Sequence, residues 1–232
     1  MLKIKSLQPP PRKSLTGRFC EWLHERNNAF TLAEVLITLG IIGVIAALTI
    51  PSLVTKFRRQ SAETQLKKFY TVINQAIEMG KAEYGDIEIE DKDKVDYDNA
   101  EYISSWMKKY ITRYLKTLKS EQQDAKFYEV ALNDGSGFIA EMYPPYDETN
   151  TSHLYIFYCR NFSKCNKNIV DGENTFWFTY DTDRKQILPL HTYNAPSSLK
   201  ENFCYNGTNK SGCAAIIMKN NWRIPDDYPW IR

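Results

Sequence analysis

The sequence predicts an α+β protein in which one long N-terminal helix packs on a small antiparallel sheet. Three observations support this prediction. An uncharged apolar run covers residues 35–55, an apolar stripe with helical spacing covers residues 57–80, and aromatic, β-branched segments recur after residue 127. The chain has 232 residues, of which 25% are charged and 43% hydrophobic, so it can bury a core of its own. This composition excludes a disordered chain and a membrane protein with many spans.

Residues 1–29 form a basic leader. They contain six basic and two acidic residues, a local net charge of +4, whereas the whole chain has a net charge of +2. The 21-residue run that follows, residues 35–55, is uncharged. At about 1.5 Å per residue, a helix of this length spans a hydrocarbon core of about 30 Å. Because basic residues precede the run, we expect residues 1–29 in the cytoplasm and the rest of the chain across the membrane.

Three interpretations of this segment are open. A secretory signal peptide fits poorly, because a polar leader precedes the run and the run exceeds the usual apolar region of about 7–15 residues. An uncleaved signal anchor fits the hydropathy but leaves Glu34 unexplained, since a carboxylate at depth in a membrane costs about 3 kcal/mol. The third interpretation comes from the residues around Glu34.

Residues 29–37, Ala-Phe-Thr-Leu-Ala-Glu-Val-Leu-Ile, resemble the processing site of type IV prepilins and type II secretion pseudopilins. In this family a prepilin peptidase cuts a basic leader before a Phe, the new amine is often methylated, and a Glu follows four residues later. Phe30 and Glu34 have this spacing, and Pro51 stands 21 residues after Phe30, where the family has a proline. The chain departs from the family at Ala29, where glycine is usual; alanine is the next smallest residue.

The resemblance implies cleavage between Ala29 and Phe30, methylation of Phe30, and assembly into a filament. In the family, the carboxylate of Glu34 is thought to neutralise the terminal amine of a neighbouring subunit, since both groups are costly alone in lipid. Pairing within one subunit, or snorkelling of Glu34 to the headgroups, is the alternative. A heterologous contact of this kind does not close, so it propagates into a helical fibre. The implied partners are a prepilin peptidase, other pilin or pseudopilin subunits, an assembly ATPase and platform protein, and the membrane.

We expect four segments along the chain: the leader (1–29), a transmembrane and assembly half of the helix (30–54), an amphipathic half (55–82) and a globular α+β head (83–232). Pro51 is expected to kink or locally open the helix, because its ring removes a hydrogen bond to the preceding turn. The stripe of the amphipathic half is expected to pack under the head. Its members are Phe57, Ala62, Leu66, Phe69, Ile73, Ala76, Ile77 and Gly80.

The head is expected to contain a second helix and four strands. Asp98 and Glu101 resemble a capping box, and apolar residues then keep helical spacing at Ile103, Trp106, Tyr110, Tyr114 and Leu118. The predicted strands are residues 127–132, 138–143, 153–159 and 175–181. Asn, Asp and Gly between the first two strands predict a hairpin, because they tolerate positive φ. The family resemblance also implies a long helix on an antiparallel sheet.

Four of the five cysteines lie outside the leader, which contains Cys20: these are Cys159, Cys165, Cys204 and Cys213. Four cysteines permit three pairings, of which the short spacings favour 159 with 165 and 204 with 213. Zinc binding is the rival interpretation, but neither pair has CxxC spacing, so no metal site is expected. The loop closed by the second pair resembles the disulfide-closed variable region of type IV pilins.

Two further segments of the head have two interpretations each. The tail from Trp222 to Trp230 is rich in aromatic residues and proline, which suits a lid packed on the head or, alternatively, a recognition surface. Residues 171–174, Asp-Gly-Glu-Asn, have the oxygen ligands of a small cation loop. They lack the EF-hand pattern, so we expect a structural loop.

Catalytic patterns are missing from the sequence. His153 on a predicted strand and His191 after Pro189 have no patterned Ser, Cys or acidic partner, and no P-loop, GxSxG elbow or Rossmann fingerprint occurs. We therefore expect a structural protein with no cofactor, a minor pilin or pseudopilin of the bacterial inner membrane and then of a periplasmic or extracellular filament. The alternative is an uncleaved, signal-anchored extracytoplasmic binding protein.

Overall fold

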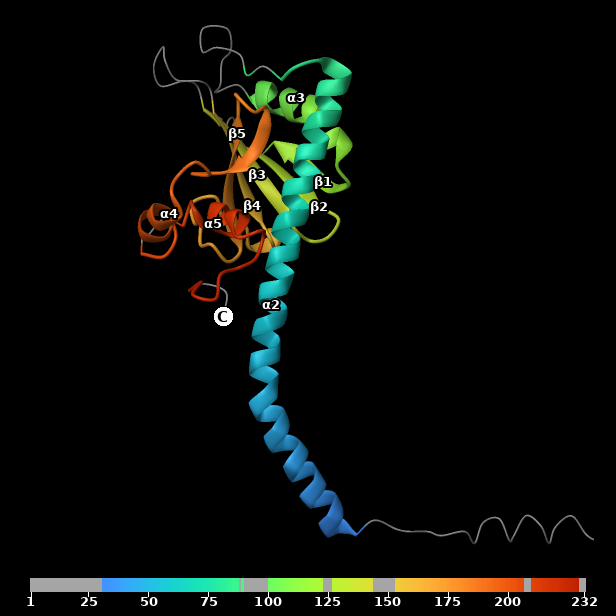
Figure 1. Cartoon of the computed structure of the whole chain (residues 1–232). Coiled ribbons are helices and arrows are strands. Elements are labelled where there is room, and N and C mark those ends of the chain that lie inside the picture. The colour runs from blue at the N-terminus through green and yellow to red at the C-terminus, as the bar shows by residue number, and fades with distance from the viewer. Residues whose placement is uncertain are drawn as a thin grey trace, which may run out of the picture. The chain divides into compact units, whose positions relative to one another are not determined.

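The computed structural model of the chain describes residues 31–87, 89, 100–122, 127–143, 153–206 and 210–229. The chain divides into two compact units, Met1–Pro51 and Ser52–Arg232. Helix α2 (Leu32–Tyr84) begins in the first unit and ends in the second (Figure 1). All other described helices and strands belong to the second unit.

The second unit contains a six-stranded antiparallel sheet in which sequence neighbours are also spatial neighbours. The chain therefore forms an up-and-down meander, and the expected α+β layout is confirmed. All four predicted strands are present, and two further strands extend the sheet at its edges. The strands are β1 (Thr117–Gln122), β2 (Phe127–Leu132), β3 (Gly137–Tyr143), β4 (His153–Cys159), β5 (Thr175–Asp181) and β6 (Gln186–Pro189).

The predicted hairpin joins β2 to β3. Gly135 has a φ of 82°, which a residue with a side chain rarely adopts, and Asp134 accepts a hydrogen bond from the Ser136 backbone N–H (3.1 Å). Gly137 is required for a different reason: a Cβ there would lie 2.4 Å from the Val130 carbonyl oxygen. The glycines of this turn thus set both its conformation and the close approach of the two strands.

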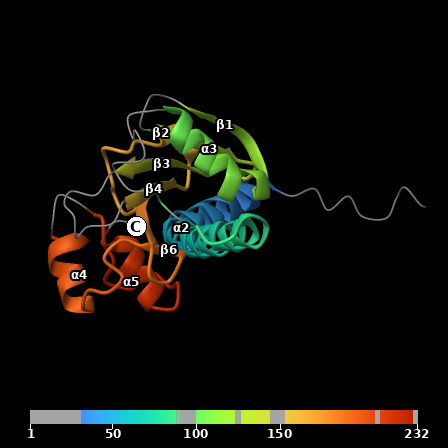
Figure 2. The same ribbon diagram turned by 90° about the horizontal axis from the view of Figure 1, so that it is seen from above.

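The core lies between one face of the sheet and the second half of α2. The register places Phe138, Tyr158 and Phe176 side by side across three strands, so all three point to the same face. Phe69 of α2 stacks on Tyr158 with ring centroids 4.1 Å apart and meets the edge of Phe178 at 5.2 Å. Figure 2, which looks nearly down the axis of α2, shows the helix beside the strands of the sheet.

The predicted apolar stripe of α2 is confirmed except at its first member. The buried residues of the helix are Ala62, Leu66, Phe69, Ile73, Ala76, Ile77 and Gly80. Phe57 is 62% exposed, because burial on this helix begins only at Ala62. Helical spacing predicts which side chains share a face, but a face is buried only where another element covers it.

The predicted second helix is present as α3 (Ala100–Tyr110), followed by a 3₁₀ turn, η1 (Thr112–Tyr114). The expected capping residue Asp98 lies outside the described residues. The prediction is wrong at Leu118, which lies in strand β1 and is 70% exposed. Leu115 is extended after η1, and Thr117 then pairs with Leu132 of β2, so strand pairing replaces the helix before residue 118 is reached.

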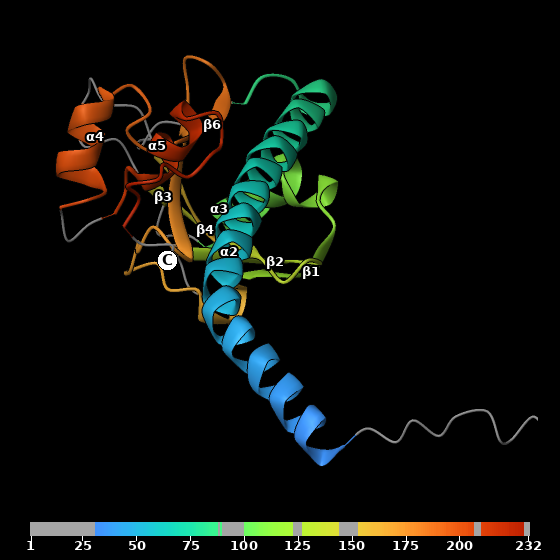
Figure 3. The ribbon, with the colours of Figure 1, turned by 60° about the horizontal axis from the view of Figure 1, so that its bottom comes forward.

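Two short helices complete the second unit, α4 (Pro196–Phe203) and α5 (Cys213–Lys219), together with the 3₁₀ turn η2 (Phe162–Lys164). Figure 3 shows α5 on one side of α2, and β1 and β2 on the other. Asn74 of α2 exchanges two hydrogen bonds with the backbone of Ile187 in β6 (2.8 and 3.0 Å). These bonds join the helix to the edge strand opposite β1.

Candidate assembly segment and the groove beside it

The first turn of α2 is closed by a reciprocal contact between Thr31 and Glu34. The Glu34 carboxylate accepts hydrogen bonds from the backbone N–H and the hydroxyl of Thr31, each at 2.9 Å. The Glu34 backbone N–H in turn donates to the Thr31 hydroxyl oxygen at 3.2 Å. This is a capping box, so Glu34 helps to begin the helix. Sequence analysis missed this contact, although threonine followed three residues later by glutamate is its usual signal.

The half of α2 before Ser52 has no buried side chain among the described residues. The helix contains a window with a mean hydropathy of 2.3, and it is long and apolar enough to cross a membrane. Its two threonine hydroxyls, those of Thr38 and Thr49, donate to the carbonyls of Val35 and Ile45, which removes the cost of placing them in an apolar medium. The large exposed apolar side chains of this half are Leu32, Val35, Leu36, Ile37, Leu39, Ile41, Ile42, Val44, Ile45, Leu48 and Ile50, and Leu53 and Val54 continue the series just after it.

Pro51 lies inside α2, and the helix continues beyond it. Because proline has no backbone N–H, the carbonyl of Ala47 loses its usual donor in the helix. The interruption is therefore limited to the hydrogen bonding around one turn. Whether the helix bends at Pro51 stays a prediction, as does a role for Pro51 in assembly.

The predicted processing site falls outside the described residues. Ala29, Phe30 and the leader before them have no described structure, so cleavage and methylation stay predictions. Glu34 and Pro51 are described, and they stand at opposite ends of the apolar half of α2. Their contacts with other copies of the chain are likewise a prediction.

The four head cysteines form two disulfides, Cys159–Cys165 and Cys204–Cys213, with Cα atoms 5.5 and 4.9 Å apart. This is the pairing that the short spacings favour. Each bond closes a small loop and contributes about 2–3 kcal/mol in the chain-entropy model. The first bond ties the end of β4 to η2, and the second ties the end of α4 to the start of α5.

The described part of the C-terminal tail packs on the head, as the lid interpretation predicts. Trp222 lies against Tyr70 of α2 with ring centroids 4.9 Å apart, and Ile224 and Tyr228 are buried. The Tyr228 hydroxyl donates to the carbonyl of Gly172 at 2.5 Å, and burial raises the pKa of this hydroxyl well above its usual value. Trp230, at the end of the tail, lies outside the described residues.

Two residues of α2 hold this tail in place. The Arg59 guanidinium donates to the carbonyls of Ile224 (3.1 Å) and Pro225 (2.5 Å), and Glu63 accepts the backbone N–H of Ile224 (2.9 Å). Sequence analysis gave neither residue a role. Their spacing of four residues places them on one helix face, but nothing local to them points to a tail some 160 residues further along the chain.

The tail and α2 enclose a polar groove of about 800 Å³. Every α2 residue that lines it lies on one helix face, at spacings of three and four. The α2 side is formed by Ser52, Thr55, Lys56, Arg59, Gln60, Glu63, Thr64 and Lys67, and the tail side by Asn220, Asn221, Trp222, Arg223, Ile224, Pro225 and Asp226. This groove, called the basal groove below, lies entirely within the second unit.

His191 is held in the head by packing. Its ring stacks on Phe203 at 3.9 Å, and its Nε2 lies 3.1 Å from the Ser211 hydroxyl. Burial lowers the pKa of His191, which favours the neutral ring. Ser211 is only 2% exposed, so its hydroxyl is poorly placed to attack a substrate. The contacts of His191 are therefore those of a packed side chain in the head. The other predicted candidate, His153, has its backbone at the start of β4.

In the loop after residue 170, the carboxylate of Asp171 accepts hydrogen bonds from the backbone of the same loop. One oxygen of Asp171 accepts hydrogen bonds from the backbone N–H groups of Glu173 (2.9 Å), Asn174 (2.8 Å) and Thr175 (2.8 Å). These bonds account for the Asp-Gly-Glu-Asn sequence as a turn. Among the described residues, no group of three or more potential metal ligands is found.

Comparisons with known proteins divide the chain at the same place as its compact units. Residues 52–231 match the model of a family of unknown function, DUF6613. Residues 25–50 match the model of the prokaryotic N-terminal methylation motif. No curated protein and no solved structure gives a significant match to the chain. The chain therefore belongs to DUF6613, a family of unknown function, and bears the N-terminal signature of type IV pilins and pseudopilins.

Proposed function

We propose that this protein is a subunit of a type IV pilus-like or type II secretion pseudopilus filament. It is first made as a membrane-anchored precursor. A prepilin peptidase cuts the precursor between Ala29 and Phe30, and the mature chain then polymerises with other pilin-type subunits. The subunit has a structural role and needs no cofactor. The N-terminal methylation motif supports the pilin-type role and agrees with membrane anchoring by the apolar helix.

The observation that carries the proposal is the contrast within α2. Its first half exposes apolar side chains around its whole circumference, whereas the second half covers its apolar stripe with the sheet. A helix that is apolar all round is stable in lipid or when packed among other apolar helices. The membrane satisfies this requirement before assembly, and the same segments of neighbouring subunits satisfy it in a filament.

Glu34 gives the packing of neighbouring subunits a register. After cleavage, Phe30 carries a positive amine four residues before Glu34 in the sequence. In a staggered filament the carboxylate of one subunit pairs with the amine of the next, and two groups that are costly alone in an apolar core become one ion pair. The capping contact with Thr31 leaves this role possible, because a carboxylate can accept several hydrogen bonds at once. We place the subunit among minor pilins or pseudopilins, since two disulfide-closed loops and an aromatic head suit a specialised subunit.

The proposal is tested by the intact mass and N-terminal sequence of the chain, expressed in cells with and without a prepilin peptidase. We expect an N-terminus at Phe30, with one added methyl group, only when the peptidase is present. Ala29→Gly, which restores the usual residue of the family, is the matched control and is expected to be processed at least as completely. Ala29→Leu is expected to stay at full length.

A full-length chain in both strains would overturn the proposal. The chain would then be a signal-anchored extracytoplasmic binding protein, whose head captures a ligand without assembly. A new N-terminus elsewhere, still formed in Ala29→Leu, would instead indicate an ordinary signal peptide.

A further inference from the structure

The basal groove carries more unpaired positive charge than its role in holding the tail requires. Four basic side chains line it, those of Lys56, Arg59, Lys67 and Arg223, against two acidic ones, those of Glu63 and Asp226. We propose that this groove binds the phosphodiester headgroup of an anionic phospholipid, in the membrane leaflet on the side of the head. The inference rests on membrane anchoring by α2 alone, and requires neither cleavage nor polymerisation.

The two acidic residues of the groove are already engaged with the chain. Glu63 accepts the Ile224 backbone N–H, and the nearest oxygen of Asp226 lies 3.5 Å from the Arg59 guanidinium. Within the described part of the chain, Lys56, Lys67 and Arg223 have no acidic partner. The groove therefore has a net positive charge and free donor groups, which is the chemistry that phosphate oxygens require.

The position of the groove along α2 matches the level of phospholipid headgroups. Lys56 follows directly on the uncharged run that ends at Thr55. Because a helix rises about 1.5 Å per residue, Lys56 and Arg59 lie within about 6 Å of the end of this run. The headgroup layer of a leaflet is about 5–8 Å thick. Lys67, about 18 Å from the end of the run, lies beyond this layer.

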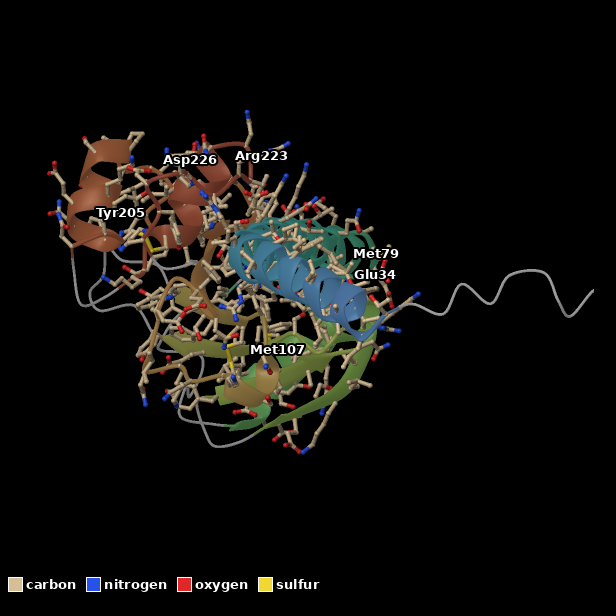
Figure 4. The ribbon with its side chains drawn as sticks, turned by 90° about the horizontal axis from the view of Figure 1, so that it is seen from below. Glu34, Met79, Met107, Tyr205, Arg223 and Asp226 are labelled. Carbon is tan, nitrogen blue, oxygen red and sulfur yellow. A yellow bond between two sulfur atoms is a disulfide. The ribbon has the colours of Figure 1, made fainter. Side chains whose placement is uncertain are left out.

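The backbone of the tail brings Arg223 to the same groove. Asn221 and Trp222 have φ angles of 54° and 61°, a left-handed conformation that is costly for a residue such as tryptophan. Stacking on Tyr70 and a hydrogen bond from the Trp222 N–H to the Ile217 carbonyl (2.8 Å) hold this turn. Figure 4 shows Arg223 and Asp226 close together on the tail. The turn thus adds a cation from the far end of the chain to those of α2.

Two other occupants have related chemistry, a soluble phosphate and the acidic surface of a second copy. The lipid is favoured by the position of the cations next to a membrane-spanning run, where an anionic surface is present at high local concentration. Phe57, exposed beside Lys56, adds an apolar ring of the kind that interfacial helices bury at the boundary between headgroups and acyl chains. Neither a soluble phosphate nor a second copy accounts for the position of these cations directly after the membrane-spanning run.

The test uses the full-length chain, purified in mild detergent and titrated with dioleoyl phosphatidylglycerol or dioleoyl phosphatidylcholine. Native mass spectrometry measures the apparent dissociation constant of each lipid. We expect the wild-type chain to bind phosphatidylglycerol at least about tenfold more tightly than phosphatidylcholine. Each basic side chain near an anionic headgroup contributes about fivefold, so Lys56→Gln with Arg223→Gln is expected to weaken phosphatidylglycerol binding about 25-fold.

The matched control is Lys108→Gln with Lys164→Gln, which also removes two exposed positive charges, but away from the groove. We expect this control to bind phosphatidylglycerol like the wild type. Equal losses in both double variants, or no preference between the two lipids in the wild-type chain, would overturn the proposal. An unchanged unfolding temperature of the groove variant shows that any lost binding is not a loss of fold.

Two further experiments distinguish the lipid from the two alternative occupants, a soluble phosphate and a second copy of the chain. If inorganic phosphate at the same concentration displaces phosphatidylglycerol, the groove is a soluble-anion site and the lipid assignment is wrong. If the groove variant keeps its lipid but loses crosslinking between copies, the groove is a contact between subunits, which also contradicts the lipid assignment. Because all these experiments use the uncleaved chain in detergent, the outcome is independent of whether the chain is processed or polymerises in cells.

Discussion

The two halves of α2 are parts of one helix, yet they solve the problem of apolar surface in opposite ways. After residue 60, seven residues of the helix are buried against the head. Before Pro51, the helix is more apolar, but none of its described residues is buried. The amphipathic half has its partner within the chain, whereas no described residue covers the apolar half. This difference separates the requirements of folding from those of the proposed assembly.

The same division has a consequence for mutations. A change at one of the buried residues of α2, which begin at Ala62, is expected to alter the free energy of unfolding of the head. A change in the first half is expected to leave the head intact and to alter membrane insertion or filament formation. Paired substitutions of the same residue type in the two regions can test this directly.

The largest expected effect is on assembly, from Glu34→Ala. Removing one partner of a buried ion pair costs about 3–5 kcal/mol, so we expect filament yield to fall more than a hundredfold. Membrane insertion and leader cleavage are expected to continue, since the apolar run is unchanged. The measurement is the amount of filament sheared from cells, with the membrane fraction probed for the mature chain.

Two further variants separate pairing from helix capping. Glu34→Gln keeps a side chain that can close the capping box but removes the charge, and is expected to fail like Glu34→Ala. Thr31→Ala removes the hydroxyl that bonds Glu34 (2.9 Å) but keeps the carboxylate, and is expected to assemble. Wild-type yield from Glu34→Ala would remove the pairing argument.

The next largest effect is expected on the stability of the head, from Phe69→Ala. Phe69 is 4% exposed and contacts the rings of Phe138, Tyr158 and Phe178. Truncating a buried phenylalanine costs about 3–5 kcal/mol. Phe57→Ala is the matched control in the same helix; its side chain is 62% exposed, and we expect a change within about 0.5 kcal/mol. Urea unfolding followed by near-UV circular dichroism measures both, and equal losses would contradict the start of burial on α2 at Ala62.

Sequence patterns predicted most of what depends on local periodicity. The stripe of α2 and the strands β2 to β5 follow from helical spacing and from alternating or β-branched segments, with the start of β3 displaced by one residue. Strand β1 was missed because it contains Lys119 and Glu121, charged residues typical of an edge strand. Strand β6 has only four residues and ends in Pro189, so its pattern is too short to be distinguished from a loop.

In the assembly segment and the basal groove, too, some residues could be predicted from local sequence and others could not. Glu34 and Pro51 were singled out by spacing, and the partner of Glu34 within the chain, Thr31, was within reach of a capping rule. The contact of Arg59 with the Ile224 carbonyl joins residues 165 positions apart, so only the folded chain brings them together. The basal groove could therefore not be predicted from local sequence.

A smaller effect is expected from Gly80→Ala. A Cβ at this position would lie 2.7 Å from the carbonyl oxygen and 2.9 Å from the Cα of Tyr110, both backbone atoms of α3. Overpacking of this kind costs about 1–3 kcal/mol, partly offset by the better helix propensity of alanine, about 1 kcal/mol. The measurement is again the free energy of unfolding of the head.

Gly43→Ala is the control from the other half of α2. Apart from the adjacent residues and backbone of the helix itself, no described atom lies within 4 Å of a Cβ at Gly43, so we expect the unfolding of the head to be unchanged. A loss of head stability in Gly43→Ala, or none in Gly80→Ala, would show that the two halves of the helix are not separated as proposed.

The smallest expected effect is a pH dependence from His191, far from either half of α2 in the sequence. Burial lowers the pKa of His191 below its usual 6.5, so the unfolded chain binds a proton more readily than the folded head. The stabilising contribution is present above about pH 6.5 and is lost as the pH falls below it. We expect His191→Asn to flatten the dependence of the unfolding free energy on pH between about 7 and 5. Asparagine tolerates the left-handed backbone at this position, where φ is 63°, so the variant removes the titrating ring at little cost in strain. An unchanged slope in His191→Asn would assign the pH dependence to other groups.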